Sequence, residues 1–466
     1  MVLVGTRSED FRQTQPPAVA VASREFARAI AFHRQGKLDE AARTYARVLE
    51  LDPGHAEALN NLGVVLRAQG KPEASVTAYE RSLALRPNDP GLLGNLGTAL
   101  RTEGKLERSL SVLYKAVALA PKAPSVHHNL GLVLRDLGHY DEALGCFERS
   151  LSIWPNNVSV RIDRALTLLA KGHYPAGFAA LEARFEADRF QTLLPGVPIW
   201  NGGEIDGETL LIRAEQNVGD VIQFCRFASA AKRAGGRTVF ECHPGLVPLL
   251  RTLEGVDEVV AFGEREGEVD MQVPLLSLPR ILQITPRSLP GRKSYLAAPE
   301  GNSMVIKHPA GSKLSVGIVW ARQPEDGTRQ VSPGPGLLPF FRLMRQPEIA
   351  IYALQRGAPA NDVKKLGASG LLHDMSNFVT DFEDMARVAV QLDLIVTADT
   401  TMAHLAGAMG RPVWLLLPYV SDWRWALDKT TTPWYANMRL FRQSAPGDWD
   451  SLFEEVGREL ESLAQD

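Results

Sequence analysis

The chain has 466 residues, 45% of them hydrophobic and 23% charged, and 51 Lys and Arg against 54 Asp and Glu give a net charge of −3. This length indicates about three domains; no apolar run approaches the ~20 residues of a membrane span, and no excess of positive charge favours nucleic acid as a partner. Three scattered cysteines and an amino end without an apolar core predict a cytoplasmic protein with neither disulfides nor a secretory signal.

The first third of the chain repeats every 34 residues. Prolines recur at 53, 87, 121 and 155, and Leu-Gly pairs recur at 62–63, 96–97 and 130–131. This period is typical of tetratricopeptide repeats, each of which is a pair of helices. We therefore expect a disordered lead over residues 1–21 and a helical solenoid over residues 22–190. Four complete repeats end near residue 157, and a fifth, less regular helical pair follows.

The concave face of such a solenoid is lined by the first helix of each repeat and suits an extended peptide. Asn61, Asn95 and Asn129 recur on that helix at the same period. An amide both donates and accepts hydrogen bonds, so a row of them can bind a peptide backbone without reading its sequence. We predict that these residues bind a peptide of a protein partner. The alternative is that they belong to the repeat consensus and hydrogen-bond within or between repeats.

From residue 207 onward, short apolar strands alternate with helices. The first run places strands over 210–215, 238–243, 258–263 and 270–275, and helices over 221–234 and 246–253. A Pro- and Gly-rich stretch separates it from a second run, with strands over 315–321, 349–355, 371–375, 394–399 and 412–417 and helices over 337–345, 382–392 and 402–409. This alternation predicts two Rossmann-like, doubly wound domains over residues 208–300 and 313–445 that face one cleft. A terminal helix follows within residues 446–466.

Ligands of doubly wound sheets bind beyond the carboxyl ends of the strands, and two loops there carry candidate chemistry. After a strand that ends at Asp399, the hydroxyls and backbone N–H groups of Thr400 and Thr401 stand at a helix amino terminus and suit a phosphate. In the first domain, Asp220 follows Gly219, whose missing side chain lets a ligand approach. Ordinary helix capping is the alternative for both loops.

These loops and their neighbours together match a known family. The match is carried by the segments 215–224, 399–410 and 412–414 and by a Trp-rich tail over 422–425, 433–435 and 438–443. The segments resemble glycosyltransferases of the heptosyltransferase-like group with the GT-B architecture, most closely the bacterial members fused to tetratricopeptide repeats. The resemblance covers most of the last 260 or so residues.

The resemblance implies that the second domain binds a nucleotide-activated sugar, with the diphosphate at Thr400 and Thr401. The implied donor-binding residues are Gly219, Arg329, Gln355, Asp399, Thr400, Thr401 and His404. The first domain presents the acceptor, and Asp220 takes the acceptor's proton as general base, which inverts the anomeric configuration. For His404, a structural role on a helix that faces the sheet is the alternative. The loop 322–329 keeps two arginines where the family usually carries a basic cluster.

No cofactor is implied beyond the nucleotide sugar, which is a substrate, and no metal. Asp448 and Asp450 have the loose spacing of a metal-binding pair, but they precede the last helix, so capping explains them better. The aromatic residues of the tail, Trp423, Trp425, Trp434 and Tyr435, either stack on a sugar or pack a domain interface.

Three functions fit the sequence. The first is an inverting, metal-independent transferase that glycosylates a protein captured by the solenoid, because such a groove raises the effective concentration of the acceptor; flagellin is an acceptor that the resemblance suggests. The second is a transferase acting on a lipid-linked or polysaccharide acceptor. The third is a non-catalytic tetratricopeptide adaptor with a decayed transferase domain. The sequence leaves open whether a hexose, a heptose or a nonulosonate is transferred.

Overall fold

The computed structural model describes residues 17–187, 193–215, 217–289, 294–301, 305–322, 334–425 and 429–465. By its internal contacts the chain divides into two units, Met1–Asn156 and Asn157–Asp466. Within the described ranges, no helix is both long enough and apolar enough to cross a membrane.

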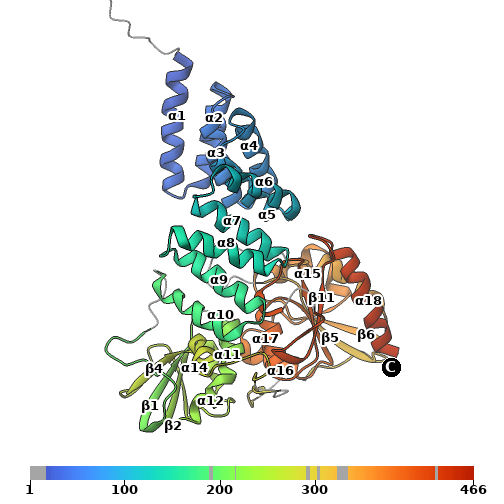
Figure 1. Cartoon of the computed structure of the whole chain (residues 1–466). Coiled ribbons are helices and arrows are strands. Elements are labelled where there is room, and N and C mark those ends of the chain that lie inside the picture. The colour runs from blue at the N-terminus through green and yellow to red at the C-terminus, as the bar shows by residue number, and fades with distance from the viewer. Residues whose placement is uncertain are drawn as a thin grey trace, which may run out of the picture. The chain divides into compact units, whose positions relative to one another are not determined.

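The first unit is a stack of antiparallel helix pairs (Figure 1). Its helices are α1 Pro17–Arg34, α2 Leu38–Leu51, α3 Ala56–Ala68, α4 Pro72–Leu85, α5 Pro90–Thr102, α6 Leu106–Leu119, α7 Pro124–Asp136 and α8 Tyr140–Ile153. The predicted 34-residue helical repeat is confirmed. Helix α1 begins at Pro17, inside the stretch expected to be a disordered lead; proline is tolerated there because the first N–H groups of a helix have no helical partner.

Small residues allow the two helices of a repeat to approach closely. An added Cβ at Gly63, Gly97 or Gly131 would lie 2.8, 2.5 or 2.6 Å from the side chain of Tyr79, Leu113 or Phe147 on the second helix. The glycine between the helices has a positive φ in each repeat, at positions 36, 70, 104 and 138, a conformation that other residues rarely adopt. The repeated glycines therefore build the solenoid.

The second unit begins with a helical pair, α9 Val158–Ala170 and α10 Tyr174–Leu181, and a 3₁₀ turn, η1 Glu182–Glu186. This pair was predicted to close the solenoid. Leu169 and Phe178 of the pair instead share one buried apolar cluster with Phe224 and Trp434. The fifth pair therefore belongs with the sheets that follow it.

The first sheet has four parallel strands in the order β3-β2-β1-β4. The strands are β1 Ile205–Arg213, β2 Gly235–Cys242, β3 Glu258–Ala261 and β4 Met271–Pro274, and the longer helices beside them are α11 Val218–Phe224, α12 Ala228–Lys232, α13 Val247–Leu250 and α14 Leu278–Ile281. Leu211 of the central strand β1 pairs with Val239 on one side and Gln272 on the other.

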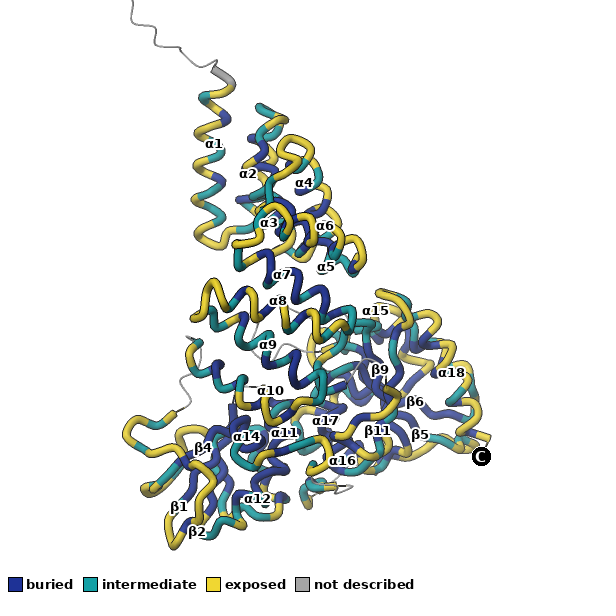
Figure 2. Tube along the Cα trace, viewed as in Figure 1, coloured by how far each residue is buried: buried dark blue, intermediate teal, exposed yellow. Residues whose placement is uncertain are grey.

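The second sheet has seven strands in the order β10-β11-β9-β8-β5-β6-β7, all parallel except the pair β10 and β11. The strands are β5 Leu314–Val319, β6 Ile349–Ala353, β7 His373–Asp374, β8 Leu394–Ala398, β9 Val413–Leu417, β10 Thr431–Thr432 and β11 Tyr435–Arg442; the helices are α15 Asp362–Lys365, α16 Phe382–Ala389, α17 Thr401–Ala408 and α18 Trp449–Gln465. The strands at the middle of this sheet, β5, β6, β8 and β9, are almost wholly buried, as the dark blue of β5, β6 and β9 in Figure 2 shows, because helices cover both faces of the sheet.

Two predicted helices differ in kind from the structure. The helix expected over 221–234 begins at Val218 and is interrupted by a 3₁₀ turn, η2 Cys225–Phe227. There the Arg226 side chain donates to the Gln223 carbonyl, which an unbroken helix would use for its own ladder. The segment expected as a helix over 337–345 is a 3₁₀ helix, η5 Leu338–Arg345. Strands β10 and β11 were not predicted as strands.

Candidate functional site

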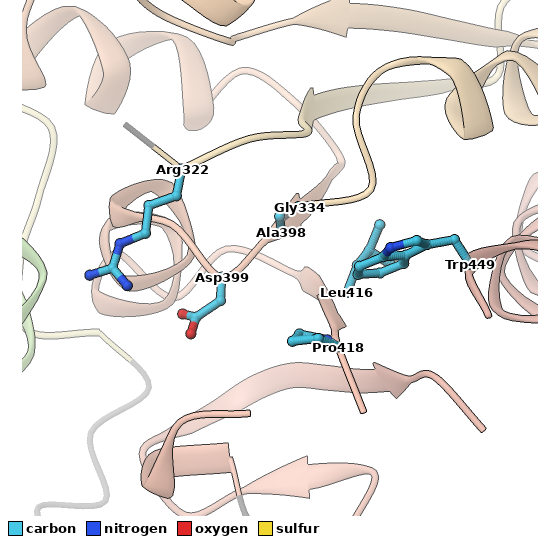
Figure 3. A pocket seen from close by; sticks show the side chains of 7 residues that line it. All are labelled: Arg322, Gly334, Ala398, Asp399, Leu416, Pro418 and Trp449. Atoms are coloured by element: carbon cyan, nitrogen blue, oxygen red, sulfur yellow. The ribbon is translucent and has the colours of Figure 1, made fainter. Parts of the chain in front are cut away.

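A small pocket lies at the point where the strand order of the second sheet reverses. From β5 the chain runs outward through β6 and β7, then returns to β8 on the other side of β5. Such a reversal is where doubly wound sheets bind ligands. The pocket encloses about 250 Å³, part of it open to solvent, and its lining residues are Arg322, Gly334, Ala398, Asp399, Leu416, Pro418 and Trp449. In Figure 3 the guanidinium of Arg322 and the indole of Trp449 lie at opposite ends of this set.

Arg322 and Asp399 give the pocket its charge. Arg322 follows β5 and is exposed, and Asp399 follows β8 and is half-buried. Burial, with the nearby Asp422 carboxylate adding to its effect, raises the pKa of Asp399 to about 6 against the opposing effects of Trp425, Arg322 and Arg424. A carboxyl that titrates near neutral pH beside an arginine suits a polar, anionic ligand.

Asp220, the predicted base, stands in the first turn of α11, beyond the carboxyl end of β1. Its backbone N–H bonds to the Asn217 side chain, and its Oδ1 accepts from Arg424. The side chain is 19% exposed, so it does not point into a core. Burial raises the pKa of Asp220; the charge of Arg424 opposes this, and Asp422 and Glu215 add to it.

Asp220 and Asp399 belong to one group of interacting charges although they come from different sheets. Arg322, Arg424 and Asp422 influence the pKa of both carboxyls. The two sheet domains also contact each other here, because α11 of the first packs against α17 of the second. The structure thus brings the predicted base and the pocket of the second sheet into one electrostatic environment.

The Thr400 hydroxyl, predicted to hold the diphosphate, is occupied within the protein. Thr397 Oγ1 donates its one proton to the Ala398 carbonyl, 2.8 Å away, so in its 2.9 Å contact with Thr400 Oγ1 it must accept. In this arrangement Thr400 donates to Thr397, so its hydroxyl is engaged within the protein. Thr401, the first residue of α17, is half-exposed and remains a predicted ligand contact.

Gly219 and His404 lie against each other. A Cβ on Gly219 would lie 3.1 Å from His404 Cδ2, so the close approach that the glycine permits is made by α17 and not by a ligand. His404 is buried, and its Nδ1 bonds to the Tyr435 hydroxyl at 2.9 Å. Burial, together with Arg424, Arg226 and Arg322, holds the pKa of His404 well below its usual range. This neutral, buried histidine fits the structural alternative better than contact with a phosphate.

Gln355 is likewise occupied. Its Oε1 accepts from the backbone N–H groups of Trp320 and Ala321, at 3.1 and 2.9 Å, and its Nε2 donates to the carbonyls of Ala321 and Arg356. The side chain is 2% exposed. Gln355 therefore fixes the chain that leads from β5 to Arg322, and a direct contact of Gln355 with the donor stays a prediction. Arg329, another predicted donor contact, lies outside the described residues.

The aromatic tail packs an interface. Trp434 is buried and stacks on Tyr174 of α10 at 5.5 Å, Trp423 meets Tyr174 edge-on at 6.1 Å, and Trp425 lies 5.5 Å from the His404 ring. Of the two predicted roles, the packing role is the one these contacts support. At the last helix, Asp448 accepts from the backbone N–H of Ser451 at 3.1 Å and so caps α18, and Asp450 pairs with Arg342. In the described part of the chain, no three acidic, histidine or cysteine side chains are arranged to hold a metal ion.

In the first unit, the asparagine row links helices. Asn95 Nδ2 donates to Asn60 Oδ1 of the preceding repeat at 2.9 Å, and Asn129 Nδ2 donates to the Gly94 carbonyl at 3.4 Å. Asn61 Oδ1 accepts from Asn60 within α3. Each amide nitrogen carries two protons, so these bonds engage one donor of Asn95 and of Asn129. The repeat-linking alternative is therefore present, and peptide binding by the same residues stays a prediction.

Two features of the site were not predicted from sequence. Arg424, which pairs with Asp220, lies in the tail that carried the resemblance, but nothing local indicates its partner. Arg184 of η1 forms a buried, two-bond ion pair with Glu215, at 3.0 and 2.9 Å, and also donates to Ser277. The spacing between such partners is set by tertiary structure and leaves no periodic signal in the sequence.

Comparisons with known proteins concern mainly the repeats. Tetratricopeptide repeat models match residues 26–90, 128–190 and 89–156. Protein FlbA of Caulobacter vibrioides is 26% identical over 324 residues, 62% of this chain and 52% of FlbA, so the chain spans about half the length of this curated relative.

Three solved structures illustrate the similarity. A crystal structure of MamA has 24% identity and a TM-score of 0.31, covering 34% of this chain and 92% of that one. Pseudomonas aeruginosa pilF has 23% identity and a TM-score of 0.34, covering 38% and 81%. YrrB, described as a TPR protein with an unusual peptide-binding site, has 20% identity and a TM-score of 0.31, covering 38% and 94%. The chain is thus a protein with tetratricopeptide repeats, followed in sequence by two α/β sheet domains.

Proposed function

We propose that this chain is an inverting, metal-independent glycosyltransferase of GT-B architecture that moves a sugar from a nucleotide-activated donor to a protein held by its repeats. The observation that carries the proposal is the meeting of Asp220, Arg322 and Asp399 in one group of charges. These residues follow strands β1, β5 and β8, and the strand order reverses beside β1 in one sheet and beside β5 in the other.

The chemistry assigns a role to each group. Arg322 meets the negative charge of the diphosphate, which grows on the leaving group as the glycosidic bond breaks. Asp399 accepts a hydrogen bond from a donor hydroxyl, and Thr401 with the amino end of α17 contacts the phosphate. Asp220 takes the proton of the acceptor hydroxyl while that oxygen attacks the anomeric carbon. Attack opposite the leaving group inverts the configuration.

The solenoid supplies the acceptor. A protein bound along the repeats presents its own hydroxyls at high effective concentration, and flagellin is the acceptor class that the family resemblance suggests. A lipid-linked or polysaccharide acceptor would leave the repeats to dock a different partner.

A non-catalytic adaptor is the second candidate, and a specific observation favours it. Four predicted donor-binding residues make contacts within the protein, as expected for a transferase fold kept as a scaffold. They are Gly219, Thr400, His404 and Gln355. The two candidates differ in whether the pocket at Arg322 and Asp399 turns over a donor.

The deciding experiment incubates the purified full chain with a panel of nucleotide sugars and measures nucleotide release with and without candidate acceptor proteins. We expect one donor to be hydrolysed slowly, and faster when the right acceptor is present. Asp220→Asn should reduce transfer about 10²–10⁴-fold with an unchanged circular dichroism spectrum. Glu459→Gln, which removes a carboxylate from the exposed pair with Arg439, is the matched control. Absence of both turnover and nucleotide binding by calorimetry would establish the adaptor instead.

A further inference from the structure

One 3₁₀ turn, η8 Trp423–Trp425, contacts three parts of the second unit with three successive side chains. Trp423 packs edge-on against Tyr174 and Phe178 of α10, with ring centroids 6.1 and 6.0 Å apart. Arg424 contacts α11 of the first sheet domain, and Trp425 lies against His404 on α17 of the second. The turn therefore joins the last helical pair to both sheets.

Arg424 is held on every side. Its Nη2 donates to Asp220, its Nη1 donates to Asp422 at 2.8 Å, and its Nε donates to Gln223. Its guanidinium also lies over the Trp423 ring, 4.6 Å from the centroid. The side chain is 11% exposed. A planar guanidinium with its nitrogens engaged in this way has one available orientation.

Asp220 is fixed at both ends by these contacts. Asn217 Oδ1 holds its backbone N–H, and Arg424 holds Oδ1 of its carboxylate. Among the described residues, every hydrogen bond of this carboxylate is made by Oδ1, which leaves Oδ2 for an acceptor. The charged groups that face it are Arg424 and Asp422 beside η8, Glu215 after β1 and Arg322 after β5, with neutral His404 of α17 behind Gly219.

We propose that Arg424 is a positioning residue that orients the Asp220 carboxylate toward the acceptor, and that α10 of the last helical pair keeps Arg424 in place through Trp423. This inference rests on the proposed role of Asp220 as base. On this proposal the fifth helical pair differs in role from the first four, because aromatic side chains of α10 hold Trp423 and, through Arg424, the Asp220 carboxylate.

The physical reason is the precision that general-base catalysis requires. A misplacement of about 1 Å in a reacting group costs on the order of 100-fold in rate. An aspartate without a partner turns about two side-chain bonds, and the bond from Nη2 of Arg424 to Oδ1 restricts that rotation. Lysine at 424 keeps the charge but loses the fork, whereas glutamine keeps polarity and loses the charge.

The activity test compares Arg424→Lys, Arg424→Gln and Trp423→Leu in the full chain, over a range of pH. We expect Arg424→Lys and Arg424→Gln to lower kcat about 10- to 100-fold, with KM for the donor nearly unchanged. In Arg424→Gln the acid limb of the rate profile should move to higher pH, because loss of the cation raises the pKa of Asp220; Arg424→Lys should leave the limb in place. Trp423→Leu should give a smaller loss of kcat in the same direction.

Arg439→Gln is the matched control, since Arg439 also pairs with a carboxylate, Glu459, and lies 4.6 Å from an aromatic centroid, Phe441. It should change neither kcat nor the pH profile. A wild-type rate and profile in Arg424→Gln would overturn the proposal.

A second arm needs no activity and so separates this inference from the proposed function. Urea unfolding midpoints are measured for Asp220→Asn, Arg424→Gln and the double variant. The proposal expects the double variant to lose clearly less than the sum of the single losses, because both changes remove one contact. The same cycle on Arg439 and Glu459, an exposed pair, should show little coupling. Additive losses at Asp220 and Arg424 would overturn the positioning role, whereas coupled losses in a protein without turnover would retain the contact and refute the transferase.

Discussion

At the scale of single residues, Thr400 shows how one proton decides between two roles. A hydroxyl at a helix amino terminus suits both a phosphate and a cap, and the sequence alone leaves both open. In the structure Thr400 does neither: it makes no side-chain cap bond to α17 and donates to Thr397. Such an assignment depends on which acceptor a neighbouring hydroxyl donates to, and no sequence pattern indicates that acceptor.

Thr400→Val is therefore expected to affect stability more than donor binding. The change removes one buried hydrogen bond, so the free energy of unfolding should fall by about 0.5–1.5 kcal/mol. Affinity for the nucleotide sugar, measured by calorimetry, should be nearly unchanged, while Thr401→Val should weaken it. Loss of affinity in Thr400→Val with unchanged stability would show that the hydroxyl turns to the ligand.

Asp399 gives a prediction that depends on pH. Its pKa of about 6 in the folded protein is above the ~3.9 of an unfolded chain. Between these two pH values the folded state binds more protons than the unfolded state. The free energy of unfolding therefore falls as the pH rises from 4 to 6, and the whole of this loss remains at neutral pH. Asp399→Asn removes that cost.

We therefore expect Asp399→Asn to be more stable than the wild type by about 1–3 kcal/mol at pH 7.5, with the difference shrinking towards pH 4. Urea unfolding at the two pH values measures it. Donor binding should weaken at the same time, because the amide keeps one acceptor oxygen but lacks the negative charge of the carboxylate. A stability difference that does not change with pH would mean that Asp399 titrates at its ordinary value.

At the scale of elements, the repeat period predicted where the helices lie, but it did not predict which part of the chain α9 and α10 pack against. Gly172 continues the series of turn glycines, and α9 and α10 are present as a pair. Their packing was not predictable from period alone, because the residues that redirect the pair, Tyr174, Phe178 and Arg184, contact partners far along the chain. Alternating apolar strands likewise predicted most of the strands of both sheets, but β10 and β11 lie in an aromatic segment without that alternation.

The ion pair of Arg184 and Glu215 is the strongest polar link between this helical pair and the first sheet. Both side chains are about 5% exposed. Removal of Arg184 leaves the buried Glu215 carboxylate without its cation, and removal of Glu215 leaves Arg184 paired with Glu182 alone, at 2.6 Å. Arg184→Met and Glu215→Gln should each lower the free energy of unfolding by about 3–5 kcal/mol.

The double variant of this pair should recover part of that loss, because neither member of the buried ion pair is then left as a charge without its partner. Denaturant unfolding of the three variants measures the coupling. Arg342→Met, which removes one partner of the exposed pair with Asp450, is the control and should cost less than about 1 kcal/mol. Losses that simply add would show that the two side chains act independently.

At the scale of the whole molecule, the division into two units separates the residues predicted to bind a peptide from those of the proposed transfer site. The boundary after Asn156 places Asn61, Asn95 and Asn129 in the first unit and every residue of the proposed transfer site in the second. Changes in the asparagine row should therefore leave donor hydrolysis in the absence of acceptor untouched. Two roles have been considered for the asparagine row: linking neighbouring repeats and binding a peptide. The contacts of the three residues allow these two roles to be tested separately.

The separation uses the different contacts of the three residues. Asn95 and Asn129 bond to the preceding repeat, whereas Asn61 bonds to Asn60 in its own helix. In a solenoid, stability is roughly the sum of repeat and interface contributions. Asn95→Ala and Asn129→Ala should each lower the stability of the first unit by about 0.5–1.5 kcal/mol, and Asn61→Ala should lower it less.

If the row also binds the acceptor's backbone, all three single variants should weaken acceptor binding to a similar degree, and the triple variant should weaken it about ten- to a thousand-fold. Binding is measured by calorimetry well below the first unfolding transition, so that lost stability does not reduce the folded fraction. Asn61→Ala is the most informative single variant, because the bond that it removes to Asn60 lies within α3, and its remaining neighbour in the preceding repeat is Tyr45. Normal acceptor affinity in Asn61→Ala and in the folded triple variant would assign the row wholly to the linking of repeats.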